Sequence, residues 1–383
     1  MKDQYKRTID YMRISVTDRC NLRCRYCMPE EGIECTSHED ILTFEEILQI
    51  AEAGAEIGIK KIKITGGEPL VRKGVISLVG SLKKVPGIEE VTMTTNGVLL
   101  KEMAEGLYLA GLDAVNISLD TLLPSKYVSI TRRDMLEAVI AGIEKAYQLG
   151  LRIKINCVAM KNFNENEIPM LAGIARNNNI DVRFIELMPI GLGRNYEYIS
   201  VKEVQDILEA EYGAGQESKL RHGNGPAVYL DYEGFQGSIG FISAMTQEFC
   251  DSCNRVRLTA QGELKLCLNH NQGICLRSLL RENHPGEISN ENKGEENWGK
   301  DQHKKDQHKR DQHKKGQHKN EQYKKEQYKK EQYEKDKYEK DKYKKDRLRD
   351  TMEDFIFKKP YQHCFHEIGR RDTEHRKMVQ IGG

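Results

Sequence analysis

The sequence lacks the features that direct a chain to a membrane, an oxidising compartment or nucleic acid. It has no apolar run long enough to cross a bilayer and no apolar leader, so we expect a cytoplasmic protein with no membrane partner. Lys and Arg number 60 and Asp and Glu 59, and this net charge of +1 gives no sign of a nucleic-acid partner. Ten cysteines occur without any secretory context, and we therefore expect free thiols rather than disulfides.

Three of these cysteines, Cys20, Cys24 and Cys27, lie close together directly after a predicted strand. Three thiolates on one loop can bind three irons of a cubic 4Fe-4S cluster and leave the fourth iron open to another ligand. Structural zinc is the alternative, but it requires four protein ligands, and only Cys35 and His38 lie near enough to add one. The spacing thus favours a cluster with an open iron.

A second group of three, Cys250, Cys253 and Cys267, occurs much later in the chain. His270 and Cys275 follow it closely, so the spacing alone suits a structural zinc site as well as a second cluster. Both alternatives stay open at this point.

Short β-branched runs alternate with amphipathic stretches over the first 200 residues. Strands are predicted at 11–17, 61–65, 90–94, 114–119, 153–160 and 182–187, and helices at such stretches as 43–56, 133–149 and 165–175. Six strand–helix units predict a parallel α/β sheet that curls into a partial (β/α)6 barrel, with its site at the carboxyl ends of the strands. Charged residues inside such strands must find an anion or a carboxylate, because an unpaired buried charge is costly.

The composition divides the chain into four parts. The barrel is expected at 1–200. A C-terminal region at 201–285, with a helix at 201–211 and hairpin-like segments around 229–230, 237–242 and 255–266, is expected to carry the second cysteine group across the open side of the barrel. A charged insertion occupies 286–350, and a helix with a Gly-Gly tail occupies 351–383.

The insertion contains a five-residue repeat that begins near residue 300 and drifts from Lys-Asp-Gln-His-Lys to Lys-Glu-Gln-Tyr-Lys. Its His or Tyr positions step by about 140° on a helix and never build one apolar face. We therefore expect a disordered, low-complexity linker that takes no part in catalysis. Weak metal binding by the histidines and contact with nucleic acid are the alternatives.

The motifs, taken in order, resemble the radical S-adenosylmethionine (SAM) superfamily. The first cysteine group has the spacing C-x3-C-x2-C with Tyr26 before the last cysteine, and the run 65–69, Thr-Gly-Gly-Glu-Pro, is similar to the superfamily's Gly-Gly-Glu-Pro element. By this resemblance the run 65–69 meets the methionyl amine of SAM, with Glu68 as an acceptor for the ammonium.

A narrower resemblance comes from the second cysteine group, from Arg255 and Arg257 beside it, and from the closing Gly382 and Gly383. Together they resemble the GTP 3',8-cyclase family of molybdenum cofactor biosynthesis, a family of lyases, over 11–282 and again from 354 to the end. Lys63 departs from the pattern, since the family commonly has Arg there.

The resemblance implies two 4Fe-4S clusters and SAM as cofactors. The clusters would be held by Cys20, Cys24 and Cys27, and by Cys250, Cys253 and Cys267. SAM would be bound at Tyr26, Gly67, Ser118 and Met188. GTP would be bound at Arg13, Lys61, Lys63, Thr94, Lys154, Arg183, Arg255 and Arg257, and the catalytic residues would include Gly382, Gly383, Arg255 and Arg257.

The implied reaction begins when one electron cleaves SAM to a 5'-deoxyadenosyl radical. This radical takes hydrogen from C3' of GTP, and C3' then joins C8 to give (8S)-3',8-cyclo-7,8-dihydroguanosine 5'-triphosphate. The implied partners are a flavodoxin- or ferredoxin-like electron donor, the downstream cyclic pyranopterin monophosphate synthase and a second copy in a homodimer. Two rivals remain: a radical SAM enzyme acting on a peptide, and a zinc-stabilised binding protein.

Overall fold

The computed structural model describes the whole chain except residues 35, 221, 248, 283–310, 364–372 and 383. It contains two units, one formed by Met1–Arg277 with Arg349–Gly383 and the other by Ser278–Leu348. Gly383, Cys35 and positions 286–310 of the insertion therefore lie outside the described residues.

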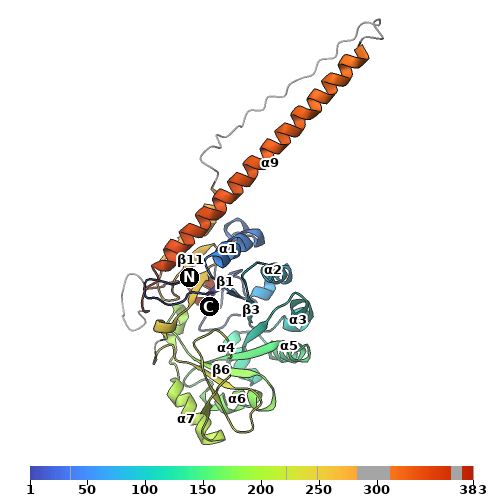
Figure 1. Cartoon of the computed structure of the whole chain (residues 1–383). Coiled ribbons are helices and arrows are strands. Elements are labelled where there is room, and N and C mark those ends of the chain that lie inside the picture. The colour runs from blue at the N-terminus through green and yellow to red at the C-terminus, as the bar shows by residue number, and fades with distance from the viewer. Residues whose placement is uncertain (35, 221, 248, 283–310, 364–372, 383) are drawn as a thin grey trace. The chain divides into compact units, whose positions relative to one another are not determined.

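The larger unit is built on one curved sheet (Figure 1). The six predicted strands are all present, as β1 (Tyr11–Ser15), β2 (Lys61–Thr65), β3 (Glu90–Thr95), β4 (Ala114–Ser118), β5 (Arg152–Ala159) and β6 (Asp181–Glu186). Each pairs in parallel with the next in chain order. Because the strands are parallel neighbours, the loops that follow them emerge at one edge, as expected.

The C-terminal region extends this sheet at both ends, where the sequence predicted only that it would cross the open side. It supplies β7 (Gln216–Glu217), β8 (Val228–Asp231), β9 (Ile239–Ile242), β10 (Arg255–Leu258), β11 (Glu263–Lys265) and β12 (Gly273–Cys275). β10 pairs in parallel with β1, and β9 pairs in parallel with β6, so eight strands run in one direction. The order is β12-β11-β10-β1-β2-β3-β4-β5-β6-β9-β8-β7, an open barrel rather than a closed one among the described residues.

Helices cover the outer surface of the sheet (Figure 1). They are α1 (Phe44–Glu56), α2 (Val75–Leu82), α3 (Leu100–Leu109), α4 (Pro124–Thr131), α5 (Leu136–Gln148), α6 (Ile168–Asn177) and α7 (Val201–Tyr212). A short helix, α8 (Leu276–Arg281), follows β12. α1 begins with a capping box in which Thr43 and Glu46 satisfy each other's backbone N–H groups. Its apolar face, which includes Ile47 and Ile50, is buried in the core.

Strand alternation separates this core from the inside of the barrel. In β2, Ile62 and Ile64 are buried in the hydrophobic core. Lys61, Lys63 and Thr65 alternate with them and face the opposite side, because successive side chains of a strand point to opposite faces. The barrel interior is therefore polar and charged.

The prediction of disorder in the insertion is wrong for positions 311–350, which belong to a helix, α9 (Asp311–Phe357). Lys, Glu and Gln favour helices, and the repeat places pairs such as Glu331 and Lys335 four residues apart, a spacing that stabilises a helix without packing. Tyr328, Tyr333, Tyr338 and Tyr343 are exposed, as the missing apolar face predicted. Near its end the helix buries Met352 and Ile356 within the larger unit.

The described helices include none with the length and apolarity needed to span a bilayer.

Candidate active site

The first cysteine group lies on the loop that follows β1. The N–H groups of Cys27 and Met28 both donate to the carbonyl of Cys24 at 2.9 Å, a tight turn that keeps the thiols together. Burial raises the pKa of Cys20 to about 11, and it also raises the pKa of Cys24, an effect to which Cys27 and Cys20 add. The effect of Cys27 and Cys20 on the pKa of Cys24 agrees with the turn that holds these residues on one short loop.

The donor set fits a cluster with one open iron. The three cysteines are free thiols, and thiolates are the usual ligands of iron–sulfur clusters. No three His, Cys, Asp or Glu side chains in the described part of the chain converge on a single metal ion. Ligands of a cluster need not converge in this way, because each one binds a different iron.

The two glycines after β2 pack against the segment that leads to Cys20. The N–H of Gly67 donates to the carbonyl of Thr17 at 2.6 Å, and a Cβ at Gly67 would lie 2.7 Å from the carbonyl oxygen of Asp18. Only glycine permits this approach. The pair therefore positions the cysteine loop.

Glu68 has partners within the protein that the sequence did not reveal. Its carboxylate accepts hydrogen bonds from the hydroxyl of Thr95 at 2.7 Å and from the N–H groups of Asn96 and Leu70 at 2.6 and 2.9 Å. Burial raises the pKa of Glu68 to about 7, although these hydrogen bonds favour its charged form. In this structure Glu68 links the ends of β2 and β3 and is not turned outward to meet an ammonium.

The other residues predicted for SAM lie at the same edge of the sheet. Ser118 is the last residue of β4, and Met188 follows β6 and packs against a hydrophobic cluster that includes Ile381 of the tail. Tyr26 donates its hydroxyl hydrogen to Asp120 at 2.7 Å. Burial raises the pKa of Asp120 to about 6. The Tyr26–Asp120 pair therefore ties the first cysteine loop to the end of β4.

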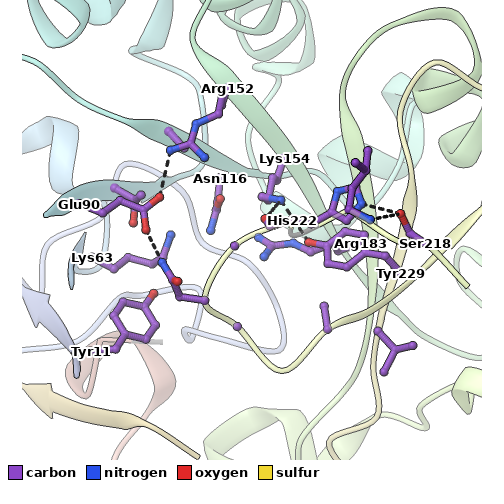
Figure 2. Close-up of a pocket in the computed structure, with 18 of the residues that line it drawn as sticks. Tyr11, Lys63, Glu90, Asn116, Arg152, Lys154, Arg183, Ser218, His222 and Tyr229 are labelled. Atoms are coloured by element: carbon purple, nitrogen blue, oxygen red, sulfur yellow. Dashed lines mark hydrogen bonds and ion pairs between the residues drawn. The ribbon is translucent and has the colours of Figure 1, made fainter. Parts of the chain in front are cut away.

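Three of the predicted GTP ligands, Lys63, Lys154 and Arg183, line a cavity of about 350 Å³ in the barrel (Figure 2). Its walls include Tyr11, Lys63, Asn116, Lys154 and Arg183, which come from β1, β2, β4, β5 and β6. Lys63 and Asn116 are the middle residues of their strands, and Tyr11, Lys154 and Arg183 lie nearer the amino ends of theirs. The cavity therefore extends away from the carboxyl ends, where the sequence predicted the site. Thr94 lies on the same strand face as Thr92, which lines the cavity.

The cations of this cavity lie near one another in a poorly solvated space. Burial lowers the pKa of Lys63 well below its usual value, and the charges of Arg183 and Arg13 lower it further. Burial also lowers the pKa of Arg13. The ammonium of Lys154 forms an ion pair with the carboxylate of Asp181 at 2.6 Å. A concentration of buried positive charge of this kind favours the binding of an anion.

A second cavity, of about 320 Å³, adjoins the first. The loop 223–225 lines both cavities. Lys61 and Arg255 line the second one beside Cys253. Lys61 is paired with Asp10 at 3.0 Å. Five of the eight predicted GTP ligands thus line two adjoining cavities, whereas Arg13, Thr94 and Arg257 line neither.

The second cysteine group lies at the amino-terminal mouth of the barrel. Cys253 precedes β10, which runs parallel to β1, whereas the first group follows β1. Burial would raise the pKa of Cys253, but the positive charges of Lys359 and Arg255 outweigh it and bring the pKa to about 6. Three free thiols in a cationic setting again fit a cluster.

Sequence reasoning missed the role of Lys359 and His363 beside this group. The ammonium of Lys359 donates to the carbonyl of Arg255 at 2.8 Å and to that of Leu266. The N–H of His363 donates to the sulfur of Cys250 at 3.4 Å. The Lys-Pro-x-x-His run at 359–363 was the available signal, but its contacts join residues about 100 positions apart in the sequence.

The C-terminal tail enters the barrel at the ends of β1 and β2. The carbonyl of Gly382 accepts a hydrogen bond from Arg257 at 3.0 Å. Gly382 has a φ of 69°, and a Cβ there would lie 2.7 Å from the Cβ of Ser15 and 3.1 Å from the hydroxyl of Thr65. The tail thus reaches the candidate site, and glycine is required by both its conformation and its surroundings.

A partial barrel with a cysteine triad after its first strand defines the class of protein: a radical SAM enzyme. The model of the Radical SAM superfamily matches residues 14–175, and that of Molybdenum Cofactor Synthesis C matches 180–309. The fold is similar to that of Streptococcus suis SuiB bound to S-adenosylmethionine, with a TM-score of 0.50, 15% identity and coverage of 68% of this chain and 60% of that one.

Curated relatives are much closer in sequence. The GTP 3',8-cyclase of Clostridium perfringens (strain SM101) is 46% identical over 281 residues, which are 73% of this chain and 87% of the relative. That of Alkaliphilus metalliredigens is 47% identical over 287 residues, 74% and 88% of the two chains. The chain therefore belongs to the GTP 3',8-cyclase family.

Proposed function

We propose that the protein converts GTP to (8S)-3',8-cyclo-7,8-dihydroguanosine 5'-triphosphate, the first step of molybdenum cofactor biosynthesis. One observation carries this proposal: a cationic barrel interior with a cysteine triad at each mouth. A triphosphate requires several cations at once, and Lys63, Lys154 and Arg183 line one cavity.

When bound, the two 4Fe-4S clusters and SAM supply the 5'-deoxyadenosyl radical and an anchor for guanine, so that hydrogen leaves C3' and C3' joins C8. Cys20, Cys24 and Cys27 would hold the first cluster, and Cys250, Cys253 and Cys267 the second. The other residues of the site would bind and orient SAM and GTP and would shield the radical from solvent. Tyr26, Gly67, Ser118 and Met188 would contact SAM at the carboxyl edge of the sheet.

The basic residues would hold the triphosphate and the base in place. Lys63, Lys154 and Arg183 would bind phosphate oxygens from the first cavity, and Lys61 and Arg255 from the second. Arg13 and Thr94 would add contacts from β1 and β3. Fixing C3' against the radical source lowers the barrier through proximity and orientation.

Arg257 and the tail would close the site. Burial lowers the pKa of Arg257 well below its usual value, and Arg13 and Arg255 lower it further. The carbonyl of Gly382 offsets part of this cost. With Gly383 beyond it, the tail would exclude water and competing hydrogen donors from the radical.

We also infer that the enzyme works in the cytoplasm with a flavodoxin- or ferredoxin-like electron donor. Its product would pass to cyclic pyranopterin monophosphate synthase, and a homodimer would be its oligomeric form. These proposals rest on the family and on the electrons that the reaction needs, one to cleave SAM and a second, with a proton, to convert the cyclised radical to the closed-shell product.

The test is anaerobic incubation of the reconstituted protein with GTP, SAM and a strong reductant, followed by chromatographic separation and mass analysis of the nucleotides. We expect a product isomeric with GTP, formed together with 5'-deoxyadenosine. Release of 5'-deoxyadenosine with unchanged GTP would instead favour a radical SAM enzyme with another substrate. A protein that contains zinc, and neither iron nor acid-labile sulfide, would exclude both the cyclase and any other radical SAM enzyme.

A further inference from the structure

The segment that leads to Gly382 is held by four charged side chains, Glu263, Lys265, Glu374 and Arg376, which we name the tail clamp. Lys265 is fully buried and Glu374 is 2% exposed, and the two form an ion pair. Arg376 donates two hydrogen bonds to the carboxylate of Glu374, both at 2.9 Å. It donates a third to Glu263 at 2.6 Å. Glu374 is thus bound by two cations at once.

Such a group calls for an explanation, because a buried ion pair rarely adds net stability. The free energy needed to remove two charges from water is about as large as the free energy gained from their attraction. Lys265 also lies directly opposite Arg257 in the antiparallel pair of β10 and β11. Two like charges opposite each other destabilise a sheet, so the carboxylate of Glu374 is needed beside them.

The clamp and Arg257 hold the tail at two points of the same hairpin. Glu374 binds Lys265 in β11, and Gly382, eight positions later, binds Arg257 in β10. Between them, Val379 and Ile381 are 2% and 1% exposed. The N–H of Glu374 also donates to the carbonyl of Asn269 at 2.6 Å, so the start of the tail is fixed in its backbone as well.

We propose that Glu374, together with Lys265 and Arg376, is a positioning group that sets the register of the tail, so that Gly382 meets Arg257. Its role in cyclisation rests on the proposed function above. With the clamp broken, Lys265 and Arg257 repel each other without compensation and the tail loses one of its two anchors. SAM cleavage, which takes place at the other cysteine group, would continue.

The test uses the reconstituted holoenzyme with Glu374→Gln, which keeps the shape of the side chain and removes its charge. Hydrogen exchange of the tail amides 378–382, measured without GTP, should become at least about tenfold faster. The ratio of 5'-deoxyadenosine to cyclised nucleotide should rise by a similar factor, while iron content and SAM cleavage stay unchanged. The matched control is Asp113→Asn, a carboxylate paired with Lys83 at 2.7 Å and remote in sequence from the tail.

A second variant, Arg376→Met, keeps the test decisive if Glu374→Gln folds poorly, because the Arg376 side chain is 35% exposed. Unchanged hydrogen exchange of the tail amides in both variants would show that the clamp does not hold the tail. Faster exchange with an unchanged product ratio would overturn its positioning role. If the unaltered protein forms no cyclised nucleotide, the proposed function fails, and the exchange measurement still decides whether the clamp holds the tail.

Discussion

Arg257 and Gly382 are joined by a hydrogen bond of 3.0 Å, which links β10 to the end of a chain that is otherwise 125 residues away. The bond lies where the tail rests on Ser15 and Thr65, the last residues of β1 and β2. Two parts of the sequence with no local relationship thus complete one site.

Gly382→Ala should suppress cyclisation and spare SAM cleavage. The new Cβ would collide with Ser15, and a left-handed conformation costs a non-glycine residue about 1–2 kcal/mol. The matched control is Gly150→Ala, because Gly150 has a φ of 77° and no atom lies within 4 Å of the position that its Cβ would take. It carries the same backbone strain without a collision. Equal effects of the two substitutions on cyclisation would contradict a specific role for the tail.

The two cysteine groups should be separable by iron analysis. Two cubes predict about eight irons per chain. Replacing Cys20, Cys24 and Cys27 with Ala should halve the iron and abolish SAM cleavage. Replacing Cys250, Cys253 and Cys267 should also halve it, but should remove cyclisation while cleavage continues.

Cys275→Ser is the control for the second group, because Cys275 is exposed. Iron content should stay unchanged in this variant. Loss of four irons would show that Cys275 is a fourth ligand and that the assignment of three is wrong.

Lys63→Met should raise the KM for GTP by roughly 30-fold, since a hydrogen bond to a charged group contributes about 2 kcal/mol. Lys63→Arg should retain most of the affinity, because Arg can also bind phosphate, though with a different geometry. Steady-state kinetics at saturating SAM would measure both. An unchanged KM in the Met variant would remove Lys63 from the triphosphate site.

The same lysine predicts a pH dependence. Burial lowers the pKa of Lys63 in the free protein, and a bound phosphate would raise it, so GTP binding takes up a proton between the two pKa values. GTP affinity should therefore fall as pH rises through that range. Lys63→Arg should remove this dependence, because a guanidinium stays protonated at higher pH. Calorimetry in buffers of different ionisation enthalpy would detect the proton; equal uptake in the two proteins would assign it elsewhere.

Replacing positions 287–346 with a short Gly/Ser linker should preserve both clusters and cyclisation. The side chains described on this part of α9 are mostly exposed, and a longer or shorter surface connection changes closure entropy by only about 0.6 kcal/mol per doubling. Helical circular dichroism should decrease. The buried Met352 and Ile356 are retained. Loss of cyclisation with normal iron content would show that the insertion serves the reaction.

The six strands β1–β6 could be predicted because each shows its own β-branched run, and the convergence of the loops follows from parallel pairing. Charges within strands, such as Lys63 and Arg183, predict an anion site, and both residues line a cavity inside the barrel rather than at the carboxyl ends of the strands. The pairing of β10 with β1 could not be foreseen, since no local pattern joins strands about 240 residues apart. The same holds for Lys265 and Glu374, whose contact depends on the tertiary fold. The helix α9 was missed because the absence of an apolar face excludes packing but does not exclude a helix.

The pairing of β1 with both β2 and β10 has a consequence for the order in which the protein is made. During synthesis, one edge of β1 stays without its partner until residue 258 has left the ribosome, and the tail is made later still. An unfinished chain therefore already contains the first cysteine loop but has neither the second triad nor the closing tail. The residues proposed to hold the first cluster are thus made well before those proposed to shield the radical. Insertion of the clusters after synthesis would therefore protect the growing chain.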